Sequence, residues 1–194
     1  MSKASPRPRS RFLPWLLLGG ALVALLSLRL FEQLRPEPLP VIAVIPAFEL
    51  FDQSGSSFDD SALRDRVWVA SFIYTACPGP CPRLVRHVAK LQKDFDGDPR
   101  VHFLSFSVDP ERDSTDVLAD YAKVHGIDGE QWRLLTGAPG DVTALVRDGF
   151  SLVLAAAGEE VSTGGPIIHS VHLVLVDGEM RVRGYYDSND EAAL

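Results

Sequence analysis

The stretch VWVASFIYTACPGPCP, residues 67–82, decides the fold, because it joins a strand-forming run to the only two cysteines of the 194-residue chain. Its first eight residues are mostly β-branched or aromatic, which predicts a buried central strand. Apolar residues then recur at spacings of three and four from Leu84 to Phe95, and Gly97 follows as a stop signal, which predicts a helix. Cys77 and Cys81 therefore lie between the end of a strand and the start of a helix.

Strands and helices alternate through the first half of the domain. FELFDQSGSSF (48–58) predicts two short strands joined by a turn at Ser54-Gly55. VHFLSFSV (101–108) predicts a second buried strand. A helix is expected over residues 115–125, with four apolar side chains on one side: Val117, Leu118, Tyr121 and Val124.

The second half ends in a hairpin. WRLLTG (132–137) predicts a short strand, and the next helix is expected over 141–148 with Asp141 as its N-cap. VHLVLV (171–176) and MRVRGYY (180–186) are joined through Asp177-Gly178, a strong hairpin signal. This order of elements predicts an α/β domain with a mixed sheet and helices on its faces.

Charge is distributed unevenly along the chain. The first 31 residues carry five basic side chains and no acid, so the remainder carries a formal charge of −12 within the total of −7. A nucleic-acid-binding domain needs a basic surface, so nucleic acid is excluded as a partner of the main domain.

The basic start leads into an uncharged run, FLPWLLLGGALVALLSL, at residues 12–28. With Arg29 able to snorkel, residues 12–31 are long enough for a transmembrane anchor. A convincing cleavage site before Arg29 is missing, which favours an anchor over a cleaved signal peptide. We expect a basic cytoplasmic segment at 1–11, a Pro-rich linker at 32–46 and a domain at 47–194 outside the cytoplasm.

Three kinds of site fit two cysteines four positions apart: a structural disulfide, a redox pair and two ligands of a metal. A disulfide closing so small a loop adds little stability, because the stabilisation grows with loop length. Four-ligand structural zinc needs a second pair of ligands, and the chain has no other cysteine. The N–H groups and partial positive charge at a helix start favour the thiolate, which serves both a redox pair and a metal site.

A histidine near the thiols would distinguish a metal site from a redox pair. His169 follows the loop Gly164-Gly165-Pro166, which is loose enough to bring an imidazole over a neighbouring site. Two thiolates and one imidazole form a soft ligand set that suits Cu(I) and can hold Cu(II). The pattern alone leaves His169 as one candidate among five histidines, the others being His87, His102, His125 and His172.

Three segments together resemble the Sco/SenC family of membrane-anchored, thioredoxin-like copper-binding proteins: residues 67–82, FSVDPERD (106–113) and IIHSVHLVLVDGEMRVRGYYD (167–187). The resemblance extends over about residues 48–187. It implies a thioredoxin-like fold and one copper ion per chain, as Cu(I) or Cu(II), held by Cys77, Cys81 and His169. Asp109 matches a family acid near the site, although it could equally be a turn residue before Pro110.

Members of this family deliver copper to the dinuclear CuA centre of cytochrome c oxidase, or keep the cysteines of that centre reduced. The resemblance therefore implies a copper chaperone rather than an enzyme, with the CuA-carrying oxidase subunit as partner. We expect a monomer in the bacterial inner membrane, with its N-terminus in the cytoplasm and its domain in the periplasm. The alternative is a periplasmic thiol–disulfide oxidoreductase in which Cys77 attacks a partner disulfide and Cys81 resolves the mixed disulfide.

Overall fold

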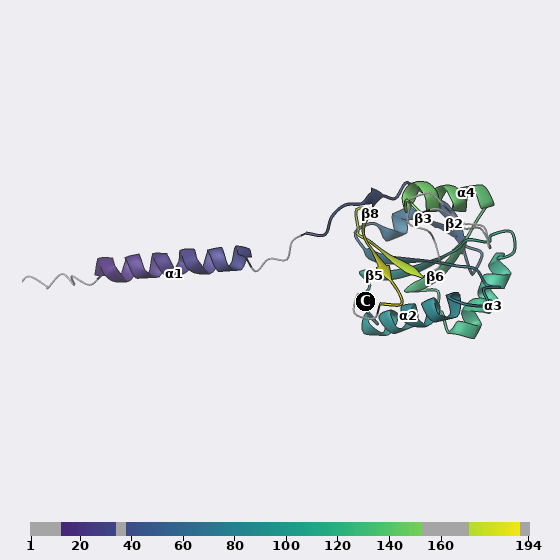
Figure 1. The fold of residues 1–194 in the computed structure, drawn as a ribbon, viewed down its shortest axis with the longest axis horizontal. Helices are drawn as coiled ribbons and strands as arrows, with labels where there is room; N and C mark the ends of the chain where they lie inside the picture. Colours follow the sequence, from purple (N-terminus) through teal and green to yellow (C-terminus); the bar gives the residue numbers. More distant parts are fainter. Residues whose placement is uncertain (1–12, 34–37, 153–170, 191–194) are drawn as a thin grey trace, which may run out of the picture. The chain divides into compact units, whose positions relative to one another are not determined.

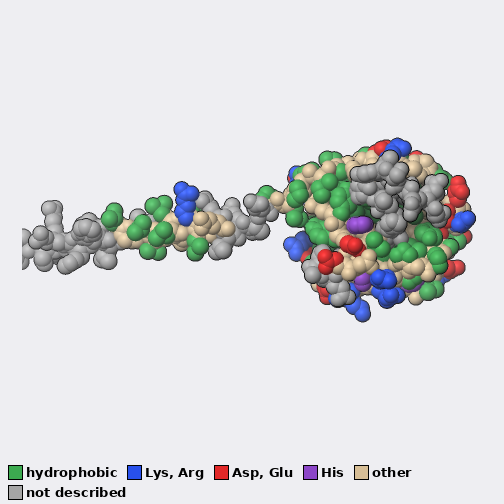
Figure 2. Space-filling view, viewed as in Figure 1, with side chains coloured by type: hydrophobic (Ala, Val, Ile, Leu, Met, Phe, Trp, Pro, Cys, Tyr) green, Lys and Arg blue, Asp and Glu red, His purple; other side chains and the backbone are tan. Residues whose placement is uncertain are grey.

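The computed structural model describes residues 13–33, 38–152 and 171–190, and the chain divides into two units, Met1–Pro38 and Leu39–Leu194. The first unit contains α1 (Leu13–Gln33), which carries exposed apolar side chains such as Leu22 and Leu26 (Figure 2). In the described part of the chain, no helix is long and apolar enough to cross a membrane. The transmembrane anchor predicted over residues 12–31 is therefore not confirmed.

The second unit is built on a mixed sheet, which has eight strands among the described residues, in the order β1-β8-β7-β4-β5-β6-β2-β3 (Figure 1). β4, β5 and β6 run parallel, and the other neighbouring pairs are antiparallel. The strands are β1 (Ala43–Val44), β2 (Glu49–Asp52), β3 (Ser57–Asp59), β4 (Val67–Ile73), β5 (Val101–Ser107), β6 (Trp132–Thr136), β7 (His172–Val176) and β8 (Arg181–Asp187). The predicted α/β class with a mixed sheet is confirmed. β1 lies within the Pro-rich segment 32–46 and pairs with β8.

Helices cover both faces of the sheet (Figure 1). The helical segments of this unit are η1 (Asp60–Leu63), α2 (Cys81–Asp94), α3 (Thr115–His125), α4 (Pro139–Ala144) and the π-helical turn η2 (Leu145–Gly149). Buried residues of α2 and α3 pack with Phe103 and Trp132 on one face. Buried residues of α4 and η2 pack with Trp68 and Phe106 on the other. The cysteines belong to the first of these two cores.

The strands and helices around the cysteines agree with the sequence prediction. β4 and β5 cover the two buried runs, and α3 spans the predicted residues 115–125. The short strands 49–52 and 57–59 form the predicted hairpin, with Gly55 at a φ of +80° in the turn. The helix after the cysteines begins at Cys81, three residues before the expected start near Leu84.

The four apolar residues predicted to share one side of α3 are not all part of the core. Val124 is 80 % exposed and Val117 is 39 % exposed, whereas Leu118 and Ala122 are buried. The prediction counted only large apolar residues along the helix. The small side chain of Ala122 packs into the core instead, so the buried stripe is centred between positions 118 and 122.

The cap of the following helix also differs from the prediction. α4 begins at Pro139, and its N-cap, Ala138, makes no side-chain hydrogen bond. Asp141 lies inside the first turn, where its negative charge faces the positive end of the helix. Proline fits the first helical position because its missing N–H has no partner there, and it starts this helix in place of the expected Asp141 cap.

The β7–β8 hairpin turns at Asp177-Gly178 as predicted, but Gly178 is required for a different reason. Met180, not Gly178, takes the left-handed conformation, with a φ of 61°. A Cβ on Gly178 would lie 2.7 Å from Asp65 Cα and 2.8 Å from the backbone nitrogen of Arg66. The backbone N–H of Asp65 also donates to the Gly178 carbonyl at 2.9 Å. Gly178 therefore allows the hairpin to pack closely against the segment that leads into β4.

Candidate metal and redox site

The two cysteines lie at the carboxyl end of β4, where the chain turns from the sheet into α2. β4 ends at Ile73, and Cys81 is the first residue of α2. Pro80 takes the N-cap position, and Pro82 lies in the first turn, where a proline removes no helical hydrogen bond. The predicted placement between a strand end and a helix start is confirmed. This is the edge at which open α/β sheets place their functional residues.

The sulfur of Cys77 faces the start of α2. The backbone N–H of Cys81 donates to Cys77 Sγ at 3.4 Å, and the backbone N–H of Cys77 donates to the Tyr74 carbonyl at 3.2 Å. The first N–H groups of a helix have no acceptor within the helix, and the Cys77 sulfur is the acceptor for one of these N–H groups. Both cysteines are thiols, with Cys77 8 % exposed and Cys81 0 % exposed. Cys77 is therefore the more accessible thiol.

The surroundings of Cys77 favour its thiolate. Burial raises the pKa of the Cys77 thiol, but hydrogen bonds outweigh this effect and lower the pKa below its ordinary value. These hydrogen bonds come from the Cys81 thiol, from the backbone N–H groups of Gly79 and Cys81, and from the Tyr74 hydroxyl. The thiolate is both the nucleophile in disulfide exchange and the form that binds metals, so this environment suits either chemistry.

Two phenols near the thiols are kept protonated. The hydrogen bond with Cys77 raises the pKa of Tyr74, and burial and nearby negative charges add to the rise. Burial, followed by the charges of Cys81, Cys77 and Asp113, raises the pKa of Tyr121 to about 12. The Tyr121 hydroxyl is buried, and no hydrogen-bond partner for it lies among the described residues. The thiols therefore have neutral O–H groups nearby rather than phenolates.

A buried carboxylate, Asp113, holds the start of the cysteine loop from the side of β5. Asp113 is 1 % exposed. It accepts hydrogen bonds from the Thr75 backbone N–H at 3.1 Å, the Thr75 hydroxyl at 2.5 Å and the Ser107 hydroxyl at 2.6 Å. β4 and β5 are parallel neighbours, so their carboxyl ends lie side by side and Asp113 bridges the residues there. Sequence reasoning missed this residue, and its signal would have been an acid just after the strand next to β4.

Asp109 lies on the same loop but faces solvent more than Asp113 does. Its side chain is 28 % exposed and pairs with Arg112 at 3.3 Å. Its carbonyl accepts the backbone N–H groups of Arg112 and Asp113, as expected for a turn residue. Its charge contributes to the raised pKa of Tyr74, which places it within electrostatic range of the cysteine loop. A direct role of Asp109 near the metal stays a prediction.

The predicted third ligand, His169, lies outside the described residues. β7 begins at His172 and runs antiparallel to β4, so its first residue is directed toward the carboxyl end of β4. Arg83 Nη1 of α2 donates to Asn189 Oδ1 at 2.8 Å, so the end of β8 also lies near the start of α2. Within residues 13–33, 38–152 and 171–190, no group of three or more His, Cys, Asp or Glu side chains could hold a metal. The complete ligand set therefore stays a prediction.

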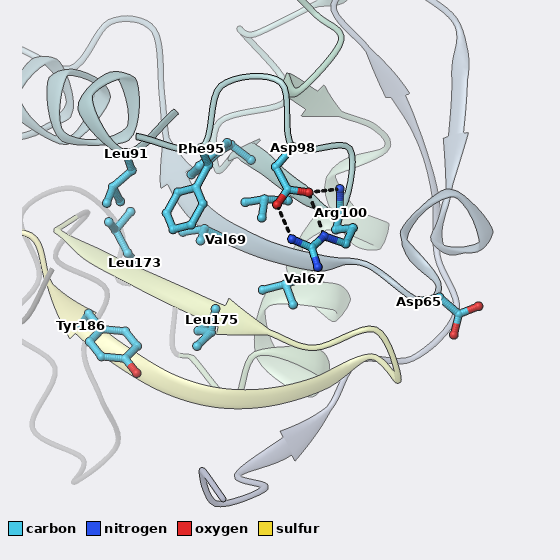
Figure 3. Close-up of a pocket in the computed structure, with 12 residues that line it drawn as sticks. Asp65, Val67, Val69, Leu91, Phe95, Asp98, Arg100, Leu173, Leu175 and Tyr186 are labelled. Atoms are coloured by element: carbon cyan, nitrogen blue, oxygen red, sulfur yellow. Dashed lines mark hydrogen bonds and ion pairs between the residues drawn. The ribbon is translucent and has the colours of Figure 1, made fainter. Parts of the chain in front are cut away.

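An apolar pocket of about 600 Å³ lies on the same sheet face, toward the other end of β4 (Figure 3). Its lining includes Leu91 and Phe95 from the end of α2 together with side chains from four strands: Val67, Val69, Val101, Phe103, Leu173, Leu175 and Tyr186. The ion pair between Asp98 and Arg100, at 2.7 Å, stands at its edge. Residues 74–81 do not contribute to this lining. The two cysteines are therefore separate from this apolar pocket.

Comparison with known proteins relates the chain to a family. A sequence profile of SCO1/SenC proteins matches residues 37–194. The SCO1 protein homolog of Bacillus subtilis is 30 % identical over 146 residues, which cover 73 % of this chain and 73 % of that protein. The matched range of this chain spans both cysteines and the loop that contains Asp109 and Asp113.

Two solved structures share the fold. BsSco, a member of the Sco family of cytochrome c oxidase assembly proteins in which a disulfide switch was identified, aligns with a TM-score of 0.67 and 24 % identity, over 80 % of this chain and 90 % of that one. Arabidopsis thaliana ScoI with copper bound aligns with a TM-score of 0.57 and 25 % identity, over 76 % of this chain and 89 % of that one. This likeness confirms the predicted thioredoxin-like α/β fold.

Proposed function

Because the chain belongs to the SCO1/SenC family, we propose that it is a copper-binding protein that acts in the assembly of cytochrome c oxidase. The observation that carries the proposal is the pair of buried thiols at the carboxyl end of β4, with the Cys77 thiolate favoured by hydrogen bonds. Soft thiolate ligands in a low-coordinate site suit copper. The copper bound by Arabidopsis ScoI and the assembly role of BsSco support the same interpretation.

The proposed site holds one copper ion through Cys77, Cys81 and His169. β7 begins at His172, three residues after position 169, and its start is directed toward the carboxyl end of β4. His169 itself lies outside the described residues, so its place in the ligand set is part of the proposal. Two thiolates with one imidazole can hold both Cu(I) and Cu(II).

The proposed partner is the oxidase subunit that carries the CuA centre, and copper is the cargo. Thiolates of the acceptor replace Cys77 and Cys81 one at a time, so the bound ion keeps soft ligands throughout the exchange. Cys77, the more exposed of the two thiols, is the ligand that an incoming thiolate can approach. The protein acts in this scheme as a monomer that meets its partner transiently.

A second candidate function is thiol–disulfide exchange, which the difference in exposure between the two thiols favours. The Cys77 thiolate attacks a partner disulfide, forms a mixed disulfide and releases one partner thiolate. Cys81 then attacks Cys77 Sγ, forms the Cys77–Cys81 disulfide and releases the second partner thiol. Two electrons pass to the partner, and the oxidised pair can no longer bind copper.

Copper binding by the reduced full chain tests the proposal. Cu(I) stoichiometry is measured by competition with a chromogenic chelator, and Cu(II) binding by the thiolate charge-transfer absorption. One tight equivalent that is lost in Cys77→Ser and weakened in His169→Ala is expected, with His125→Ala as the matched control. Weak binding in all variants, together with fast reduction of a disulfide substrate, would replace the copper proposal with the second candidate.

The cellular location is a separate proposal, which rests on the sequence. Five basic residues and no acid precede or flank the uncharged run 12–28, so we propose that the domain acts outside the cytoplasm at the membrane. Fusions of the chain's C-terminus to reporters that are active on only one side of the membrane test it. Activity of the cytoplasmic reporter alone would reject the proposed orientation.

A further inference from the structure

We infer that Asp113 is a positioning residue for the copper site, because it fixes the start of the loop that carries Cys77. The inference rests on the proposed copper binding by Cys77 and Cys81. Asp113 itself does not reach the sulfurs through any hydrogen bond of the described residues. It acts through Thr75, which is two residues before Cys77.

The carboxylate of Asp113 is anchored on two sides. Its Oδ1 accepts the Thr75 hydroxyl at 2.5 Å, and its Oδ2 accepts the Thr75 backbone N–H at 3.1 Å and the Ser107 hydroxyl at 2.6 Å. Ser107 is the last residue of β5, and its hydroxyl oxygen also accepts the Asp109 backbone N–H at 3.2 Å. One buried group thus connects the end of β5, the loop after it and the loop after β4.

Asp113 is buried without a basic partner among the described residues. Among the described residues it is 1 % exposed and forms no ion pair with a basic side chain, so its negative charge is stabilised by hydrogen-bond donors alone. Burying an unpaired carboxylate is costly unless such donors are held in place. A neutral residue could fill this space at a lower desolvation cost. The presence of an acid here is therefore best explained by the hydrogen bonds that it accepts from Thr75 and Ser107.

What Asp113 holds is the first half of the cysteine loop. Residues 74–80 form hydrogen bonds with one another and with α2. In the described part of the chain, their other hydrogen bonds all go to Asp113. The turn then closes when the Cys77 N–H donates to the Tyr74 carbonyl at 3.2 Å. Fixing Thr75 therefore fixes the base of the turn whose far end presents the Cys77 sulfur to Cys81. Groups that orient metal ligands in this way typically change metal affinity by about 10- to 100-fold when they are removed.

Three variants at Thr75 and Asp113, and one control variant, test the inference in the full chain. Thr75→Val removes the hydroxyl that Asp113 accepts, while Thr75→Ser keeps it. Asp113→Asn keeps the size of the side chain but removes the charge. Ser71→Ala is the matched control, because it deletes another buried hydroxyl bond, to Ser105 at 2.7 Å, in β4 away from the loop.

The measurements are the Cu(I) affinity, the Cu(II)–thiolate absorption, the alkylation rate of Cys77 in the metal-free protein and the thermal unfolding temperature. We expect about 10- to 100-fold weaker Cu(I) binding in Asp113→Asn and Thr75→Val, with a shifted absorption and an altered alkylation rate. Thr75→Ser is expected to behave as the unmodified chain. Ser71→Ala is expected to lower the unfolding temperature without changing the copper or alkylation readouts.

The outcomes separate the inference from the proposed function. If the unmodified chain binds copper, and Asp113→Asn and Thr75→Val change only the unfolding temperature, as Ser71→Ala does, the positioning role is overturned. If the unmodified chain does not bind copper, the proposed function fails. In that case the alkylation rate decides the inference: a rate altered in Thr75→Val and restored in Thr75→Ser supports positioning of Cys77, and an unchanged rate rejects it.

Discussion

The backbone N–H of Cys81 donates to the sulfur of Cys77 at 3.4 Å, so one atom serves both as a candidate ligand and as the acceptor for the start of α2. Any new bond formed by this sulfur competes with that hydrogen bond. Oxidation of Cys77 or metal binding by its sulfur is therefore expected to change the hydrogen bonding of the first turn of α2.

Cys77 is expected to react first with iodoacetamide in the reduced protein. It is the more exposed thiol, and hydrogen bonds lower its pKa from the ordinary 9.0. Its rate should therefore reach half of its maximum at a lower pH than that of an unfolded cysteine. Cys81→Ala removes a hydrogen bond to the sulfur, so the pKa should rise again and the rate at neutral pH should fall. Peptide mapping by mass spectrometry checks this order, and equal labelling of both thiols in the native state would contradict it.

Gly178→Ala is expected to destabilise the domain by roughly 1–3 kcal/mol, because the new methyl group meets backbone atoms that cannot rotate away. The nearest is Asp65 Cα at 2.7 Å. Gly140→Ala is the matched control, since a Cβ there has nothing within 4 Å and alanine favours a helix. Urea unfolding of both variants gives the comparison. Equal stabilities would show that the hairpin can move away from Asp65.

Asp52→Asn is expected to lower the free energy of unfolding by about 2–3 kcal/mol at neutral pH. Asp52 is 2 % exposed and accepts Arg133 Nη1 at 2.6 Å, and an amide nitrogen turned toward Arg133 would face another donor. Burial raises the pKa of Asp52, but hydrogen bonds from Ser54 and Ser56 and the charge of Arg133 together lower it below 3.8.

The pH dependence of this effect follows from the direction of the shift. A carboxylate with a lowered pKa in the folded state contributes its full stabilisation above its unfolded pKa and loses it as pH falls through the folded value. The difference between the two proteins should therefore be constant from pH 5 to 7 and shrink below about pH 3.8. Asp148→Asn, in an exposed ion pair, should change stability by less than about 1 kcal/mol. A pH-independent difference would assign the loss to packing instead.

Leu118→Ala and Val124→Ala are expected to differ sharply although both lie on α3. Leu118 is fully buried, and its truncation should cost about 2–5 kcal/mol. Val124 is 80 % exposed, so its truncation should change stability by less than about 0.5 kcal/mol. Chemical unfolding measures both. A large loss for Val124→Ala would restore the sequence-based assignment of the buried side.

The sequence predicted the elements whose signals are local. The runs at 67–73 and 101–107 are long and apolar enough to be recognised as central strands, and the cysteine loop follows from their position. The details that the sequence did not predict depend on distant partners. Ala122 is buried because the sheet lies beneath it, and Ala43 pairs with Val182 of a strand far along the chain.

The candidate site shows the same division. Cys77 and Cys81 could be identified from their spacing, since both stand in one short segment. Asp113 could not, because its role appears only when the carboxyl ends of β4 and β5 are side by side. A single sequence does not distinguish a buried aspartate that accepts hydrogen bonds from three donors from an exposed aspartate in a turn.

The sheet order has a consequence for how the protein is made. β4, which leads into the cysteine loop, lies between β5 and β7, and its β7 partners include Val174 and Val176, about a hundred residues later in the chain. Pairings between distant segments form late in folding, because a long loop must close first. A chain still emerging from the ribosome therefore has two thiols but an unfinished sheet beneath them. If the cysteines bind copper as proposed, copper loading follows completion of the fold, and a truncated or stalled chain displays an unprotected cysteine pair.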